Sequence, residues 1–307
     1  MSILLLYTAC VPLGYLSYLK LVETYSPTIA LLASIAIAYL PTYFITHYLS
    51  RRGGLTLRWV QKLPLLDHFS RYMQSTITLE EKLDHSKQYI FGIFPHGACT
   101  LSHGLTMTDC CGMLSEHHRG DRVDLAASVL FFVPFFKELF LFLGCVDAGS
   151  STAHFNLRLK KSLLIFVGGE KEQLMTVPGE HKIFLKSRKG FVKLAMIYGT
   201  DLVPMYAFGE NEAYTISQFL SPLRHWMQRT LGIGICIFWG WGGTIIPHKV
   251  KLQIEIGKPI PVPKTPKADI TPQALDALHL TFVTEMQRLF ERTKAKHGLG
   301  SAKLEIL

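Results

Sequence analysis

Charged side chains are scarce in this chain of 307 residues. They make up 18% of it, against 49% hydrophobic residues. A composition this apolar excludes an intrinsically disordered protein, because disordered chains combine low hydrophobicity with high charge. The 24 glycines and 15 prolines follow no repeating triplet, which excludes the collagen-like and low-complexity classes. The length suffices for one large domain or two small ones around a sizeable core.

Cysteine is also scarce, and its spacing excludes several kinds of site. The six cysteines include no C-x-x-C pair. They therefore form no zinc ribbon and no thioredoxin-like redox motif, and a chain this long needs no disulfide framework. We interpret them as reduced thiols of a cytosol-facing protein.

Several catalytic and cofactor motifs are missing. The sequence has no G-x-S-x-G nucleophile elbow, no H-E-x-x-H, no Walker loop and no G-x-G-x-x-G after a strand. The segment Glu116–His118 lacks a metal-ligand spacing and is interpreted as a solvated loop. We therefore predict neither a metal nor a bound cofactor.

Acidic residues are outnumbered by basic ones. There are 23 Asp and Glu against 32 Lys and Arg, a formal net charge of +9. This balance favours an anionic partner, such as a phosphate-bearing small molecule, an acidic membrane surface or a nucleic acid. No nucleic-acid reader motif is present, so we expect no nucleic-acid partner.

The first fifty residues are far more apolar than the rest. An apolar run over 3–19 is followed by a polar break over 20–26 and a second apolar run over 27–49. Since a membrane-spanning helix needs about 20 apolar residues, the second run is long enough and the first is marginal. Basic residues then follow at Arg51 and Arg52. The pattern predicts a membrane-embedded helical hairpin over 1–50, with the body over 51–307 in the cytosol. A secretory signal would need a basic start that Met1 and Ser2 do not provide, and a buried core helix remains an alternative for the first run alone.

The body alternates segments of strand and helix character, which indicates an α/β domain. The predicted strands are Tyr89–Pro95, Leu163–Val167, Leu202–Phe208 and Lys251–Ile256. Pro204 suggests a strand start or a sheet edge. The period-two alternation of Lys251–Ile256 predicts one wet face.

Two helices are predicted between and after these strands. One covers Phe191–Tyr198. The other follows Thr271 as N-cap and Pro272 in its first turn, and Gly298 ends it. Its apolar residues recur at three- and four-residue steps, at Leu275, Leu278, Phe282, Met286 and Leu289.

Four polar segments follow predicted strands or open a helix. Phe94–Gly97 delivers His96 at the carboxyl end of a strand, where α/β sheets place their ligands. An imidazole there is suited to act as a general base near neutral pH. Gly168–Glu172 and Phe208–Glu212 also follow strands, and Lys186–Lys193 begins a helix around Gly190, where phosphate binds well. Taken alone, the turns at His96 and at Gly168–Glu172 are more often structural than functional, and the basic helix start is as often a solvated surface as a site.

Together these segments resemble the diacylglycerol acyltransferase 2 family, which also holds monoacylglycerol and wax-alcohol acyltransferases. The segments that show the resemblance are YIFGIFPHG (89–97), VGGEKE (167–172), VPG (177–179), RKGFVKLA (188–195) and DLVPMYAFGENEAY (201–214). Their order and spacing match the family from about Tyr39 to Leu299. The resemblance implies a mixed α/β sheet flanked by helices, of the glycerolipid-acyltransferase type.

The resemblance also implies roles for individual residues. The family motif H-P-H-G falls on Phe94–Gly97, so His96 corresponds to its second His, the expected catalytic base. Glu172 is the candidate carboxylate partner of His96, with Glu210 second. Other expected substrate-binding residues share the strand ends or the basic segment, and they are Pro95, Gly97, Gly168, Gly169, Arg188, Lys189, Gly190, Glu210 and Asn211.

The chain departs from the family pattern at several positions. Phe94 replaces the first His of the motif, and Leu101 stands where the wider superfamily has the Asp of H-x4-D. Gly149 and Ser150 stand where the family often has an Arg. The stretch Trp239–Gly242 replaces a His-Gly-Arg-Gly-like segment with two aromatic rings. The last two departures bear on the acceptor more than on the reaction, whereas Leu101 means that a carboxylate partner of His96 must come from elsewhere.

The resemblance implies acyl transfer from acyl-CoA, as co-substrate, to the hydroxyl of a neutral glycerolipid. Diacylglycerol is the expected acceptor, with monoacylglycerol or a long-chain alcohol as alternatives. An acyl-Cys route through Cys99 and a catalytically inactive lipid-droplet-binding relative are further alternatives. The expected location is the endoplasmic reticulum membrane or a lipid droplet, and a homo-oligomer is left open.

Overall fold

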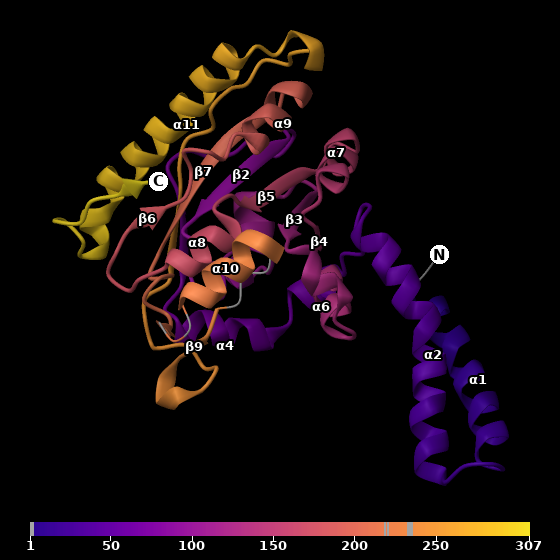
Figure 1. The fold of residues 1–307 in the computed structure, drawn as a ribbon. Helices are drawn as coiled ribbons and strands as arrows, with labels where there is room; N and C mark the ends of the chain where they lie inside the picture. Colours follow the sequence, from indigo (N-terminus) through magenta and orange to yellow (C-terminus); the bar gives the residue numbers. More distant parts are fainter. Residues whose placement is uncertain (1–2, 218, 220, 232–235) are drawn as a thin grey trace.

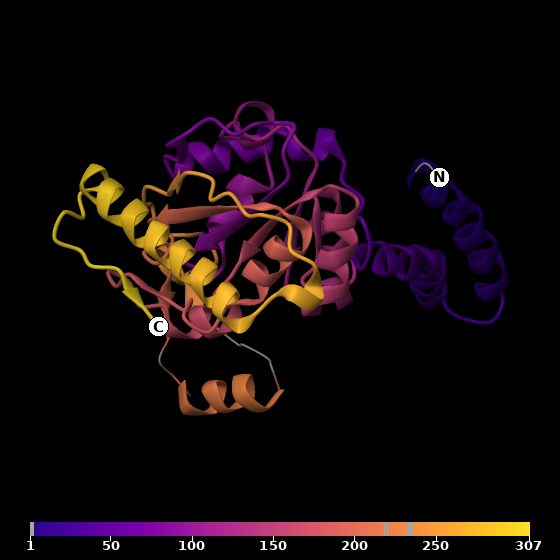
Figure 2. The ribbon, with the colours of Figure 1, turned by 90° about the horizontal axis from the view of Figure 1, so that it is seen from above.

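A computed structural model describes residues 3–217, 219, 221–231 and 236–307. At its N-terminus the helices α1 (Ile3–Leu21) and α2 (Pro27–Ser50) pack side by side and project from the remainder of the chain (Figures 1 and 2). Small side chains allow this close approach, since a Cβ added to Gly14 would lie 3.0 Å from the Cβ of Ala38.

Among the described helices, α2 is long and apolar enough to cross a membrane by length and composition. Only 17% of its most apolar window is buried inside the protein. Two adjacent helices were expected here, and the structure contains them. Their embedding as a membrane hairpin and the division of the chain at residue 50 stay predictions.

A seven-stranded mixed sheet forms the body, in the order β1-β10-β7-β2-β5-β3-β4. All neighbouring strands are parallel except β10 and β7, which are antiparallel. The bounds are β1 (Thr76–Leu79), β2 (Tyr89–Phe94), β3 (Arg122–Ala126), β4 (Cys145–Asp147), β5 (Ser162–Phe166), β7 (Asp201–Phe208) and β10 (Gln253–Ile256). The expected mixed α/β architecture is confirmed.

Helices cover both faces of this sheet. The face with α7 (Ser150–Arg158), α9 (Gly190–Tyr198) and α11 (Pro272–Thr293) holds one buried apolar cluster, and the face with α4 (Pro64–Tyr72) and α5 (Leu101–Thr106) holds the other. Side chains along β2 alternate between the two clusters, as the strand period of two requires. Because both faces are covered, β2 is buried along its whole length.

The remaining elements are short or peripheral. The other helices are α3 (Arg58–Gln61), α6 (Phe136–Phe142), α8 (Gly169–Met175) and α10 (Ser221–Leu231), with η1 (Met113–His117), η2 (Ser128–Phe132), η3 (Trp241–Gly243), η4 (Lys267–Asp269) and η5 (Lys294–His297). Two small sheets pair β6 (Lys182–Ile183) with β11 (Glu305–Ile306) and β8 (Thr215–Ile216) with β9 (Phe238–Trp239).

The two predicted helices are confirmed. Phe191–Tyr198 lies in α9, and the side chain of Thr271 caps α11 by accepting a hydrogen bond from the Ala274 amide at 3.2 Å. The helical region ends at Gly298, whose φ of +74° suits glycine.

Pro204 does not mark an edge or a strand start, contrary to the prediction. It lies inside β7, between β2 and β10. Its carbonyl oxygen accepts from the Gly257 amide at 2.9 Å, on the side where β10 has already ended at Ile256. The missing N–H of the proline therefore faces a gap in the ladder and costs no hydrogen bond.

Two further predictions are wrong because other segments cover the surface. The polar side chains of β10 do not form a wet face, since Glu255 is buried and accepts from Lys296 at 2.9 Å. His118 is not in a solvated loop. It is fully buried against Tyr89 and Phe91, with its Nε2 3.2 Å from the hydroxyl of Ser162.

Candidate active site

The carboxyl ends of three adjacent parallel strands bring the predicted segments together. Pro95 and His96 follow β2, Gly168 follows β5, and Glu210 follows β7. Parallel strands end at the same edge of a sheet, so residues distant in sequence meet there. The structure thus joins three of the four polar segments around His96.

The imidazole of His96 is partly buried and oriented by its own loop. Its Nδ1 lies 3.1 Å from the carbonyl oxygen of Gly97. Because a carbonyl oxygen only accepts, Nδ1 carries the hydrogen, and Nε2 keeps its lone pair. The ring meets Phe166 edge to face, with centroids 5.8 Å apart.

Burial keeps this ring neutral. Desolvation lowers the pKa of His96 from its usual 6.5 to about 4, and the nearby His103 adds to the shift. At neutral pH the ring is therefore in the form that accepts a proton, as a general base must be.

The carboxylate of Glu172 holds the backbone of His96, not its ring. It accepts from the main-chain N–H of His96 and, at 2.7 Å, from that of Phe184. Burial raises the pKa of this carboxyl to about 7. Glu172 therefore fixes where the His96 loop lies, and it does so from the α8 side.

Glu210 performs the same task from the opposite strand. Its two oxygens accept from the amides of Leu101 and Ser102, both at 2.7 Å. Burial also raises the pKa of Glu210 to about 7. Two buried carboxylates thus clamp the segment that carries His96 at both of its ends.

Glycines make room for both carboxylates. A Cβ on Gly97, whose φ is +61°, would lie 2.6 Å from Cγ of Glu210. A Cβ on Gly168 would lie 2.1 Å from Oε2 of Glu172. Both positions exclude any larger residue while the carboxylates keep their places.

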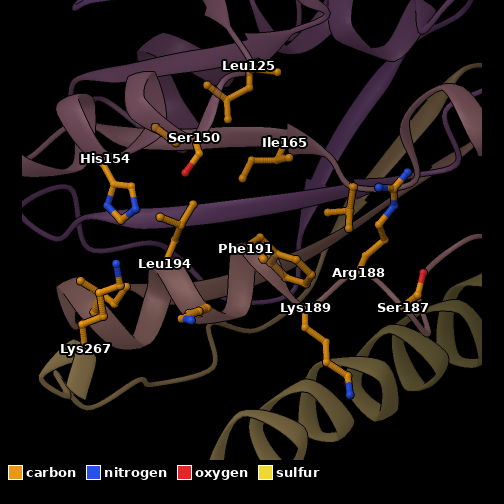
Figure 3. A pocket seen from close by; sticks show the side chains of 16 residues that line it. Leu125, Ser150, His154, Ile165, Ser187, Arg188, Lys189, Phe191, Leu194 and Lys267 are labelled. Carbon is orange, nitrogen blue, oxygen red and sulfur yellow. The ribbon is translucent and has the colours of Figure 1, made fainter. Parts of the chain in front are cut away.

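The predicted basic segment lines a separate cavity of about 580 Å³ (Figure 3). Arg188, Lys189 and Gly190 lie at the start of α9, and Lys193 and Lys267 add two more charges. The apolar lining includes Leu125, Ile165, Phe191 and Leu194. Positive side chains at a helix N-terminus above an apolar floor suit an amphipathic phosphate ester.

The cavity and His96 lie on opposite faces of the sheet. Ile165 and Val167 line the cavity, whereas Phe166 between them contacts His96. The two places are linked over the edge of the sheet, because Arg188 donates from Nη2 to the carbonyl of Gly168 at 2.9 Å. A ligand that fills both must therefore cross the turn at Gly168 and Gly169.

Asn211, a predicted substrate-binding residue, contacts the protein itself. It donates from Nδ2 to the carbonyl oxygen of Glu180 at 2.8 Å, so it braces a neighbouring loop.

Cys99 is the candidate nucleophile of the alternative acyl-Cys route. The pKa of its thiol is raised to about 11 by desolvation, with Glu210 adding to the shift. A thiolate nucleophile is therefore disfavoured at this position.

Sequence reasoning missed a buried charged group beside the site. His103 on α5 packs on Phe166 with ring centroids 5.1 Å apart, and its Nε2 lies 3.4 Å from Oδ2 of Asp124. Arg122 pairs with the same Asp124 at 2.7 Å. The available signal was position alone, since His103 lies seven residues after His96, on the helix that follows β2.

Comparisons with known proteins agree with the resemblance. A family model described as diacylglycerol acyltransferase matches residues 26–306. Diacylglycerol O-acyltransferase 2 of Xenopus tropicalis is 31% identical over 100% of this chain and 86% of its own length. The bovine (Bos taurus) protein of that name is 30% identical over 88% and 78%, and human (Homo sapiens) 2-acylglycerol O-acyltransferase 3 is 29% identical over 87% and 82%. Among solved structures, the 1-acyl-sn-glycerophosphate acyltransferase PlsC from Thermotoga maritima covers 72% of this chain and 76% of its own, at TM-score 0.42 and 12% identity.

Proposed function

The chain belongs to the diacylglycerol acyltransferase family, and from this premise we propose that it esterifies diacylglycerol with acyl-CoA to give triacylglycerol. It is an acyltransferase acting on a neutral glycerolipid. The acceptor is the finer part of the proposal, because the relatives include both diacylglycerol and 2-acylglycerol acyltransferases.

His96 serves as the general base in this proposal. Its Nε2 takes the hydroxyl proton as the oxygen of the acceptor attacks the thioester carbonyl carbon. The C–S bond then breaks, the ester forms, and the CoA sulfur receives the proton from His96. The observation that carries this assignment is the neutral ring held by Gly97 at the carboxyl end of β2.

Acyl-CoA is the co-substrate, and no bound cofactor is proposed. The basic cavity beside α9 suits its phosphates, with Arg188 and Lys189 as ligands. The pantetheine arm would then cross the Gly168–Gly169 turn to bring the thioester to His96. Glu172 and Glu210 act as positioning residues in this arrangement.

The protein is membrane-associated. Its apolar substrates dissolve in the bilayer, and α2 is suited to span it. We place it in the endoplasmic reticulum membrane or on lipid droplets, with the hairpin embedded and the catalytic domain facing the cytosol. Self-association as a homo-oligomer is compatible with this placement.

The test is incorporation of labelled acyl-CoA by membranes that carry the full chain, with the products separated by thin-layer chromatography. Triacylglycerol should be the main product when diacylglycerol is supplied. The His96→Asn variant should lose at least about 100-fold in rate, the lower end of the general-base contribution. The exposed His85→Asn variant is the matched control and should keep its activity.

Other results would overturn parts of the proposal. Full activity in His96→Asn membranes would exclude His96 as the base. Product from monoacylglycerol or a long-chain alcohol alone would reassign the acceptor. An inactive wild-type chain that still binds lipid droplets would favour a non-catalytic lipid-binding relative.

A further inference from the structure

All four tryptophans of the chain are exposed. The exposed fractions are 67% for Trp59, 56% for Trp226, 38% for Trp239 and 64% for Trp241. Tryptophan is among the more buried residue types in water-soluble domains. It is enriched at the interface between membrane and water, where its amphipathic ring is stable. None of the four lies in the hairpin, so their exposure is a property of the body.

Two of these rings lie on a protruding loop. The chain leaves β9 at Trp239, turns through η3 at Trp241 and presents Ile245, which is 83% exposed, and Ile246. In Figure 1 this loop extends below β9, at the end of the body where α4 lies. The family that this chain resembles has a His-Gly-Arg-Gly-like segment where Trp239–Gly242 stand, so two aromatic rings occupy this part of the loop.

A second apolar surface lies on η2 and α6. Its exposed large side chains are Val129, Phe132, Val133, Phe135, Phe136 and Leu139. Phe135 has a φ of +64°, which is strained for a bulky residue. The fold thus holds an unfavourable backbone while it exposes an aromatic ring.

The α6 surface is continuous with the hairpin. Tyr39 of α2 stacks on Phe135 with centroids 4.6 Å apart and accepts from its amide at 3.1 Å. The same hydroxyl donates to Glu138 at 2.9 Å, and Lys137 donates to the carbonyl of Tyr43 at 2.5 Å. These contacts fix the angle between α2 and the body. In Figure 1, α2 leaves α6 toward the lower right, and the β9 loop projects at the lower left of the body.

We propose that this end of the body docks into the surface of the lipid bilayer beside the hairpin. The docking surface comprises Trp59 on α3, the η2–α6 segment 129–139 and the loop 239–246. The occupant is a lipid surface because the surface continues from an apolar helix long enough to span a bilayer. Exposed basic residues next to it, Lys62, Lys249 and Lys251, suit anionic headgroups.

Native fluorescence tests the docking directly. The full chain is reconstituted into vesicles of phosphatidylcholine and phosphatidylserine, with and without bromine near the top of the acyl chains. Because the hairpin has no tryptophan, quenching by bromine reports on the body alone. We expect strong quenching and a blue-shifted emission relative to the protein in detergent.

Single-tryptophan variants locate the contact. A chain that keeps only Trp241, with phenylalanine at the other three positions, should be quenched. The matched control carries phenylalanine at all four positions and Leu280→Trp. Leu280 is 63% exposed on α11, which lies away from the β9 loop in Figure 1. Its tryptophan should not be quenched.

This inference rests on the membrane association in the proposed function, and flotation separates the two. Vesicles that float with bound protein, but leave Trp241 unquenched, would overturn docking and leave the hairpin anchor standing. Protein that does not float would overturn both. Equal quenching at Trp241 and at position 280 would show deep or unoriented insertion, and it would also overturn the proposed surface.

Discussion

A single imidazole links the pH behaviour of this protein to its chemistry. In the folded chain, desolvation lowers the pKa of His96 to about 4, against 6.5 when it is exposed. Between about pH 4 and pH 6.5, His96 therefore binds a proton in the unfolded state but not in the folded state. The stability that neutral His96 provides is complete above about pH 6.5 and is lost as the pH falls toward 4.

The prediction concerns the His96→Asn variant, whose side chain does not titrate. We expect wild type to lose thermal stability relative to this variant when the pH is lowered from about 7.5 to about 5. The full effect at low pH is at most about 3.5 kcal/mol, since the shift from 6.5 to about 4 spans about 2.5 pKa units and one unit corresponds to about 1.36 kcal/mol. Thermal unfolding of both full chains in the same detergent measures it. Parallel curves at every pH would contradict a depressed pKa at this residue.

Gly168 gives a second prediction at this scale. Its Cβ would lie 2.1 Å from a Glu172 oxygen, so Gly168→Ala must displace the carboxylate that holds the His96 amide. We expect the rate to fall by at least about tenfold, as misplacement of a catalytic group typically costs that much or more.

Gly300→Ala is the matched control for Gly168→Ala, because nothing lies within 4 Å of a Cβ at Gly300. The assay is acyl transfer by purified full chains in detergent. If Gly168→Ala and Gly300→Ala are equally active, Glu172 does not position the base.

Among the elements, those with a regular pattern could be predicted from the sequence. The strands at Tyr89, Leu163 and Leu202 and the helix after Thr271 were found because buried strands and capped amphipathic helices have local signatures. The prediction for Pro204 was wrong, because a proline is tolerated inside β7 only where the neighbouring strand β10 has ended. The end of β10 is a feature of the tertiary structure and has no local signal. Glu255 misled for the same reason, because its cover comes from the segment after α11.

The same limit applies to the site, where residues could be named from the sequence but their contacts could not. His96 and Glu172 could be named from strand ends and from the family resemblance. That Glu172 binds the main chain of His96, and that the basic cavity lies on the other face of β5, needed the pairing of strands. The hydroxyl of Tyr39 that joins α2 to α6 had no sequence signal, because its partners are about a hundred residues away.

The junction between α2 and α6 carries a prediction at the element scale. Tyr39→Phe removes one hydroxyl that donates to Glu138 and accepts from the Phe135 amide. Hydrogen bonds to charged groups contribute about 1.5–3 kcal/mol, so the apparent unfolding temperature should fall by several degrees. The exposed Tyr15→Phe variant on α1 should unfold like wild type. Equal unfolding temperatures for both variants would show that the hydroxyl does not fasten the hairpin.

At the scale of the whole molecule, the two faces of the sheet carry different parts of the proposed site. The face with α5 holds His96 with its clamping carboxylates, and the face with α9 holds the basic cavity. Four basic side chains line that cavity, where a polyphosphate would bind, and they are Arg188, Lys189, Lys193 and Lys267. The exposed apolar side chains of η2, α6 and the loop after β9 are a third feature of the body, separate from both faces.

The last prediction tests this division through the cavity lysines. Lys189 pairs with Asp276 at 2.6 Å, but the two side chains are 40% and 57% exposed, and solvent-exposed pairs contribute little. Lys189 is therefore free to exchange that partner for a phosphate. The double variant Lys189→Ala with Lys193→Ala should raise the KM for acyl-CoA about tenfold or more, because charged hydrogen bonds to the substrate are lost. Its kcat should be nearly unchanged, because His96 is untouched. Acyl-pantetheine lacks the nucleotide and its phosphates, so its KM should be the same for wild type and for the double variant. The control variant Lys303→Ala should behave as wild type with either substrate. A KM for acyl-CoA that the double variant leaves unchanged would exclude the cavity beside α9 as the phosphate site, even if His96 remained the base.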